Sequence, residues 1–148
     1  MANILIVYGS TSGNTEWVAN QLEAQAKAAG HAVAKSKAAD VSASGLCGGK
    51  DLVLFGCSTW GDEEIELQED FIPLFEAFDQ IGASGVKTGV FGCGDEDYKY
   101  FCGAVDAITD KLTELGSKVV GGKLKINGDP EESKGAIQTW GEGVLAAL

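Results

Sequence analysis

Three short polar segments carry the residues whose types and spacing could do chemistry, and each follows an apolar run. The first is Gly9-Ser10-Thr11-Ser12-Gly13-Asn14-Thr15, with four hydroxyl groups, an amide and two glycines. Glycines let backbone N–H groups converge, and a helix beginning there adds partial positive charge, so a phosphate could bind. No lysine or arginine occurs between residues 1 and 26, so neutral donors would hold the anion. These residue types also fit an ordinary strand-to-helix turn with a helix cap.

The composition of this segment excludes two common nucleotide-binding loops. A Walker loop needs a lysine after its last glycine, and Asn14 follows Gly13 here. The segment also lacks the G-x-G-x-x-G pattern of dinucleotide-binding folds. A terminal monophosphate therefore suits it better than a triphosphate with magnesium.

Each of the other two segments presents one large aromatic side chain among small and acidic residues. They read Cys57-Ser58-Thr59-Trp60-Gly61-Asp62 and Gly92-Cys93-Gly94-Asp95-Glu96-Asp97-Tyr98. Trp60 and Tyr98 could clamp a flat ring, with about 0.5–1.5 kcal/mol per aromatic pair beyond the buried area. A phosphate tail and an aromatic head together describe FMN, although either aromatic alone could be a partly buried surface residue.

The elements that must position these segments alternate along the chain. Short apolar runs predict strands at residues 4–8, 32–36, 52–55, 88–91 and 119–120. Helical periods cover residues 18–29, 101–115 and 137–148, and Pro73 places another helix start near Asp70. The helix after the second strand is short or missing around residues 40–48. Strict alternation predicts one α/β domain over residues 1–148: a doubly wound, five-stranded parallel sheet with helices on both faces.

Such a sheet binds ligands beyond the carboxyl ends of its strands, where the strand order reverses. For the order 2-1-3-4-5, the loops after strands 1, 3 and 4 form this crevice. Those loops are the three polar segments, so we expect them to meet.

Charge and cysteine usage limit the class of protein. The chain has 22 acidic residues against 11 lysines and no arginine, a net charge of −11, and residues 57–98 hold 11 of the acids. Such a field repels nucleic acid and anionic membranes and attracts basic partners. No apolar run approaches the roughly 18 residues of a membrane span, and no basic leader is present, so we expect a cytoplasmic protein. The four cysteines contain no C-x-x-C pair, which favours reduced thiols, and the ligands for zinc are lacking.

The three segments together resemble those of the flavodoxins. Residues 9–15 look like the phosphate signature, residues 58–62 like the first flavin loop, and residues 93–102 like the second. The resemblance covers the whole chain and is closest to short-chain flavodoxins of sulfate-reducing bacteria, with serine at position 12 where threonine is commoner. It implies a flavodoxin-like fold with non-covalently bound FMN.

The resemblance also implies the cofactor-binding residues. The phosphate would be held by Ser10, Thr11, Ser12, Gly13, Asn14 and Thr15. Ser58 and Thr59 would contact the phosphate and ribityl chain, and Trp60 and Tyr98 would cover the two ring faces. The rest of the set, from the two flavin loops and for the most part at the polar edge of the ring, comprises Gly61, Asp62, Cys93, Gly94, Asp95, Tyr100, Phe101 and Cys102. No catalytic acid or base and no metal site is implied.

The implied function is that of a low-potential, one-electron carrier rather than an enzyme. Acids beside the ring would disfavour the anionic, fully reduced flavin, so we expect the neutral semiquinone to accumulate. Gly61 could let its peptide turn and accept the new N–H of the ring. Partners would be redox proteins with basic docking faces, such as cytochromes, oxidoreductases or hydrogenase-type enzymes, and the carrier would be a monomer.

Three rival functions use related folds. A response-regulator receiver needs acids after strand 1 and an Asp after strand 3, where this chain has Gly9-Ser10 and Gly56-Cys57. A low-molecular-weight tyrosine phosphatase needs an arginine. An FMN-dependent NAD(P)H or quinone reductase stays the alternative.

Overall fold

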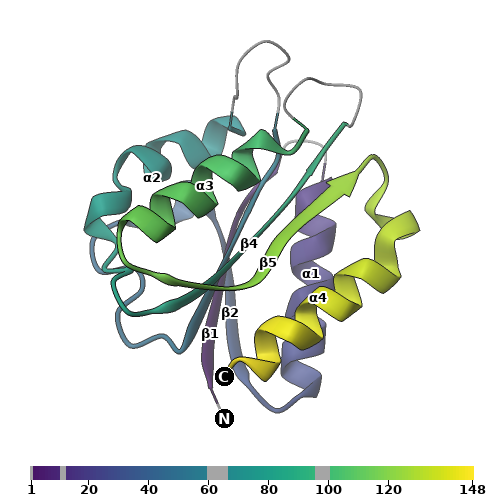
Figure 1. The fold of residues 1–148 in the computed structure, drawn as a ribbon, viewed down its shortest axis with the longest axis horizontal. Helices are drawn as coiled ribbons and strands as arrows, with labels where there is room; N and C mark the ends of the chain where they lie inside the picture. Colours follow the sequence, from purple (N-terminus) through teal and green to yellow (C-terminus); the bar gives the residue numbers. More distant parts are fainter. Residues whose placement is uncertain (1, 11–12, 60–66, 96–100) are drawn as a thin grey trace.

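The computed structural model describes residues 2–10, 13–59, 67–95 and 101–148. Within these ranges, five parallel strands form one sheet with the spatial order β2-β1-β3-β4-β5, which confirms the predicted topology (Figure 1). The strands are β1 (Asn3–Gly9), β2 (Ala32–Lys37), β3 (Leu52–Cys57), β4 (Lys87–Gly94) and β5 (Lys118–Asn127). β3 and β4 run further than the apolar pattern indicated, so Cys57 and Cys93 lie within the strands rather than after them.

Helices cover both faces of the sheet because the central strands are apolar on both sides. α1 (Asn14–Ala28) and α4 (Lys134–Ala146) lie on one face, and α2 (Ile72–Glu76) and α3 (Gly103–Glu114) on the other (Figure 1). On β1, Ile4 and Ile6 pack toward α1 and α4, whereas Leu5 and Val7 pack toward α2 and α3. This follows from the two-residue period of a strand. Each fully buried aliphatic side chain contributes about 1.5–3 kcal/mol, so β1 is anchored from both sides.

The helix expected to be short or missing after the second strand is indeed short. β2 is followed by a single 3-10 turn at Ala38–Asp40 and then by turns up to residue 49. The next helical segment begins with a 3-10 turn at Glu69–Phe71 and continues as α2, with Pro73 in its first turn. The start predicted near Asp70 is therefore confirmed.

The prediction for the fifth strand was wrong in extent. β5 spans residues 118–127 instead of 119–120. Two glycines interrupt its apolar pattern, and Gly121 has a φ of +78° at an irregularity in the pairing with β4. A Cβ at Gly121 would lie 2.4 Å from Val144, so the close approach of α4 requires a glycine here. Beyond this irregularity, Leu124 and Ile126 resume the buried face.

Candidate functional site

The three polar segments meet at the carboxyl edge of the sheet, as predicted. The backbone N–H of Ser58 donates to the carbonyl of Gly9 at 3.4 Å, and that of Thr59 donates to the carbonyl of Cys93 at 3.2 Å. β3 lies between β1 and β4 in the sheet, so its end joins the ends of both neighbours. The crevice at the point of strand-order reversal is therefore built by these three strand ends.

The first segment opens directly onto helix α1. Gly13 precedes the helix with a φ of +92°, which favours glycine, and its N–H donates to Ser10 Oγ at 3.1 Å. In the described residues, no side chain caps the start of α1. A helix start exposes backbone N–H groups and the positive end of the helix dipole, which suits an anion. Neutral donors, rather than lysines, define this part of the site.

A buried pair of hydroxyl groups joins α1 to the end of β3. Thr15 Oγ1 and Ser58 Oγ are 2.7 Å apart, and the two residues are 0% and 6% exposed. Because each hydroxyl can both donate and accept, one of the pair keeps a proton for a third partner. The pair lies at the start of α1, where the phosphate is expected.

Thr59 connects the second segment to helix α3. Its Oγ1 accepts a hydrogen bond from the backbone N–H of Ala104 at 2.9 Å. Cys102 caps the start of α3 with a φ of +50°, and its Sγ faces the carbonyl of Gly92 at 3.6 Å. A Cβ at Gly94 would lie 3.1 Å from that sulfur, so a glycine permits the close approach of the two ends of the third segment.

Gln68 is a residue of this site that the sequence analysis missed. It is 2% exposed, its N–H donates to the carbonyl of Ser58 at 2.9 Å, and its Oε1 accepts from the N–H of Asp70 at 2.9 Å. Its side chain caps the 3-10 turn at Glu69–Phe71, but glutamine is not among the residues typical of helix N-caps. The sequence therefore carries no signal for Gln68, whose backbone N–H joins the far end of the segment after Thr59 to Ser58.

Eleven of the eighteen residues predicted to contact the cofactor lie in the described part of the chain, all of them at or just beyond this edge. They are Ser10, Gly13, Asn14, Thr15, Ser58, Thr59, Cys93, Gly94, Asp95, Phe101 and Cys102. Seven lie outside the described residues: Thr11, Ser12, Trp60, Gly61, Asp62, Tyr98 and Tyr100. Phe101 packs against the hydrophobic core on the α2 and α3 face.

The cysteines near this edge are buried and form no disulfide. Burial raises the pKa of the Cys57 and Cys102 thiols to about 12, and that of Cys93 to about 11. Thiols with such pKa values are not nucleophiles at neutral pH. All four cysteines are free in the structure, and the expectation of reduced thiols stays a prediction. No residue of the described ranges belongs to a cluster of three or more His, Cys, Asp or Glu that could bind a metal.

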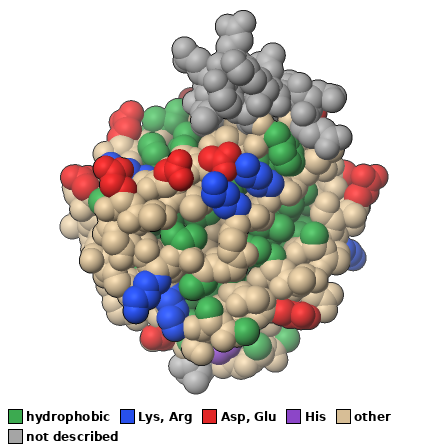
Figure 2. Space-filling model, in the orientation of Figure 1, with side chains coloured by type: hydrophobic (Ala, Val, Ile, Leu, Met, Phe, Trp, Pro, Cys, Tyr) green, Lys and Arg blue, Asp and Glu red, His purple; other side chains and the backbone are tan. Residues whose placement is uncertain are grey.

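Acidic side chains dominate the described surface around the site. Asp95 is exposed after β4, and Asp129, Glu131 and Glu132 are exposed after β5. The two groups are joined because the N–H of Gly128 donates to the carbonyl of Gly94 at 3.0 Å. In the view of Figure 2, acidic side chains form a band across the upper half of the molecule, with a few lysines among them. Two lysines of β5, Lys123 and Lys125, are each bonded to Asp106 at 2.8 Å, which neutralises part of their charge.

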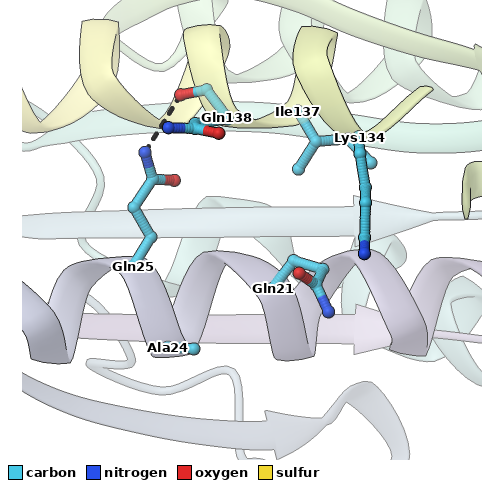
Figure 3. Close-up of a pocket in the computed structure, with 6 residues that line it drawn as sticks. All are labelled: Gln21, Ala24, Gln25, Lys134, Ile137 and Gln138. Atoms are coloured by element: carbon cyan, nitrogen blue, oxygen red, sulfur yellow. Dashed lines mark hydrogen bonds between the residues drawn. The ribbon is translucent and has the colours of Figure 1, made fainter.

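A groove between α1 and α4 lies apart from this edge. It has a volume of about 470 Å³ and is lined by amides, one lysine and two apolar side chains: Gln21, Ala24, Gln25, Lys134, Ile137 and Gln138 (Figure 3). Gln25 crosses it and donates to the carbonyl of Gln138 at 3.0 Å. The groove includes Lys134 at the start of α4, but none of the strand ends that meet at the carboxyl edge lines it. In the described residues, no helix has the length and apolar character to cross a membrane.

Comparison with known proteins identifies the family. The flavodoxin family model matches residues 6–140. A flavodoxin of Nitratidesulfovibrio vulgaris (strain Miyazaki F) is 54% identical over 148 residues, which is the full length of both chains. A flavodoxin of Maridesulfovibrio salexigens is 52% identical over 144 residues, covering 97% of each chain. The crystal structure of oxidised Flavodoxin 1 from Bacillus cereus superimposes with a TM-score of 0.90 at 28% identity, covering 99% of each chain.

The chain belongs to the flavodoxin family. As a flavodoxin, it is a low-potential electron carrier that contains FMN. It exchanges electrons with other redox proteins and is not an enzyme. This confirms the predicted family, fold, cofactor and function, and it argues against a reductase. The residues present fit FMN because a helix start without cations, a buried hydroxyl pair and acidic surroundings all lie at one edge.

Proposed function

We propose that the eighteen residues predicted from the sequence form the FMN site, and that the whole chain, residues 1–148, acts as one FMN-binding domain. The observation that carries the proposal is the meeting of three segments through Thr15, Ser58, Thr59 and Cys93. The phosphate is held at the start of α1 by the backbone and hydroxyl groups of residues 10–15, with Ser58 behind them. The ring lies farther along the edge, toward the segments that contain Trp60 and Tyr98.

FMN supplies the one-electron chemistry, and the protein positions it and sets its potentials. Asp95 and the other acids make additional negative charge unfavourable beside the ring. Because the described phosphate donors are neutral, they do not offset this field. The second one-electron potential is therefore expected to be strongly negative.

The partners we propose are redox proteins that dock through a basic face, such as cytochromes, oxidoreductases or hydrogenase-type enzymes. The support is the net charge of −11 and the exposed acidic residues that follow β4 and β5. Electrostatic attraction between complementary faces raises association rates and weakens with salt. We propose that the protein works as a monomer in the cytoplasm, where its four free thiols stay reduced.

The test is a stepwise reduction of the purified protein, followed by its visible spectrum and by potentiometry. Two separate one-electron steps with one FMN per chain support the proposal, and one two-electron step contradicts it. Electron transfer to a basic cytochrome should slow with rising salt. It should also slow in the Glu131→Gln, Glu132→Gln double variant but not in the control Glu142→Gln, on helix α4. Equal rates in all three proteins would contradict the proposed docking face.

A further inference from the structure

Ser58 and Thr59 are consecutive residues whose side chains reach opposite faces of the sheet. Successive side chains at a strand end alternate in direction. Ser58 is bonded to Thr15 on helix α1, and Thr59 accepts from the N–H of Ala104 on helix α3. Both residues are 6% exposed, so neither hydrogen bond competes freely with water.

Helix α3 depends on Thr59 for a cap that its own sequence does not provide. Cys102 precedes the helix, has a φ of +50°, and supplies no side-chain cap. Among the described residues, it is the only one other than glycine with a positive φ. The first-turn N–H groups of a helix need acceptors from outside it. The Thr59 hydroxyl, 45 residues earlier in the chain, is such an acceptor for Ala104.

Thr59 also contacts the described ends of both segments that are proposed to border the ring. It directly precedes residues 60–66, and it forms an antiparallel bridge with Leu67 at the far end of that segment. Its N–H is bonded to the carbonyl of Cys93, before the other segment, and its hydroxyl to Ala104, after it. One residue therefore fixes the spacing between the two segments at their bases.

We infer that Thr59 is a positioning residue for the redox reaction: its hydroxyl holds the start of α3, and thereby Cys102, at a fixed distance from the ends of β3 and β4. The inference rests on the proposed FMN site and adds a role that requires no contact with the ring. Loss of the hydroxyl frees the start of α3 and admits water beside the ring. The potentials then move toward those of free FMN.

The experiment compares three variants of the FMN-loaded protein with the wild type. Thr59→Val removes the acceptor and keeps the shape, and Thr59→Ser keeps the acceptor. The control is Thr109→Val on the same helix, because Thr109 Oγ1 is buried and bonded to no other described residue. The readouts are the two one-electron potentials and the affinities of the apoproteins for FMN and riboflavin.

Thr59→Val should bind both flavins about tenfold more weakly, because the start of α3 can relax in the apoprotein, whereas in the complex the Ala104 N–H stays buried and unsatisfied, a penalty of that order. The ratio of the two affinities should stay unchanged, because the Thr59 hydroxyl is bonded to Ala104 and the contact expected of Thr59 near the phosphate and ribityl chain is assigned to its backbone. The second one-electron potential should rise by about 40 mV. This corresponds to about a fivefold change in the affinity for the fully reduced flavin relative to that for the semiquinone. Thr59→Ser and Thr109→Val should match the wild type.

Two results would overturn the inference. One is a Thr59→Val variant that only melts at a lower temperature, with potentials and affinities unchanged. The other, which needs no variant, is rapid hydrogen exchange of the Ala104 amide in the wild type. If the wild-type apoprotein binds neither flavin, the proposed function fails instead, so the two failures are distinguishable.

Discussion

Replacing Thr15 by valine tests how the site holds a phosphate without cations. Thr15 is fully buried, and its Oγ1 lies 2.7 Å from Ser58 Oγ. Valine has nearly the same shape, so the packing of α1 is kept while the hydroxyl is lost. Ser58 then keeps a buried hydroxyl without its partner, a penalty of about 1–3 kcal/mol.

If that penalty applies in the complex, the dissociation constant for FMN rises about 5- to 150-fold, at 1.4 kcal/mol for each factor of ten. Riboflavin lacks the phosphate, and its dissociation constant should change by less than about twofold. The assay is titration of each apoprotein with FMN and with riboflavin, followed by the quenching of flavin fluorescence.

The sheet offers a matched control at its opposite edge. Thr88 is also fully buried, and its Oγ1 lies 2.6 Å from Ser117 Oγ at the amino end of β4. Thr88→Val removes the same kind of bond and should lower stability to a similar degree with no effect on either flavin. The reasoning is refuted if Thr15→Val weakens riboflavin as much as FMN, or if Thr88→Val weakens FMN as much as Thr15→Val.

Three further predictions concern charge and the thiols. Asp95→Asn should raise the second one-electron potential by tens of millivolts, because two charges about 10 Å apart repel by roughly 1–2 kcal/mol at an effective dielectric of 20–40; potentiometry showing no shift would contradict this. Burial acts to raise the pKa of Asp106, but hydrogen bonds from Lys123 and Lys125 outweigh it and hold the pKa below its usual value. This stabilisation is present above the ordinary carboxyl pKa and lost as the pH falls through the lowered one, so Asp106→Asn should cost about 0.5–1 kcal/mol in urea unfolding at pH 7 and progressively less toward pH 2. Burial raises the pKa of Cys47 to about 11, and like the other three buried thiols it should react with a disulfide reagent at pH 8 only after unfolding; rapid labelling of the native protein would be inconsistent with this burial.

The sheet and the meeting of its polar ends could be predicted because the signals are local. Continuous apolar runs such as residues 52–55 are typical of strands covered on both faces. Gly30 and Gly116 mark the ends of α1 and α3, and both have the positive φ that a helix C-terminus favours. Once the alternation of elements was recognised, the position of the site followed from strand order alone.

The extent of β5 could not be predicted because its determinants are distant in sequence. Gly121 is a glycine owing to Val144 on α4, and the indole N–H of Trp140 donates to the carbonyl of Gly122 at 3.1 Å. Beyond the two glycines, Lys123 and Lys125 alternate with the buried Leu124 and Ile126, and Asp106 pairs with both lysines. From the sequence alone, the pair Gly121-Gly122 is typical of a turn, which ended the predicted strand at residue 120.

The contacts of the site between residues distant in the sequence also could not be predicted from the sequence. Hydroxyl groups at positions 15, 58 and 59 suggested ligand contacts, but their bonds to one another and to Ala104 depend on the packing of three elements. Gln68 is polar yet buried, and only its neighbours Ser58 and Asp70 explain why.

The most direct test of the FMN site is an amide chemical-shift map of the apoprotein during titration with FMN. The largest shifts should fall on residues 13–15, 58–59, 93–95 and 102–104, at one equivalent of FMN. The amide chemical shifts of Gln21, Gln25 and Gln138, in the groove between α1 and α4, should not change. Large shifts in that groove, with the amides at the carboxyl edge unmoved, would contradict the account.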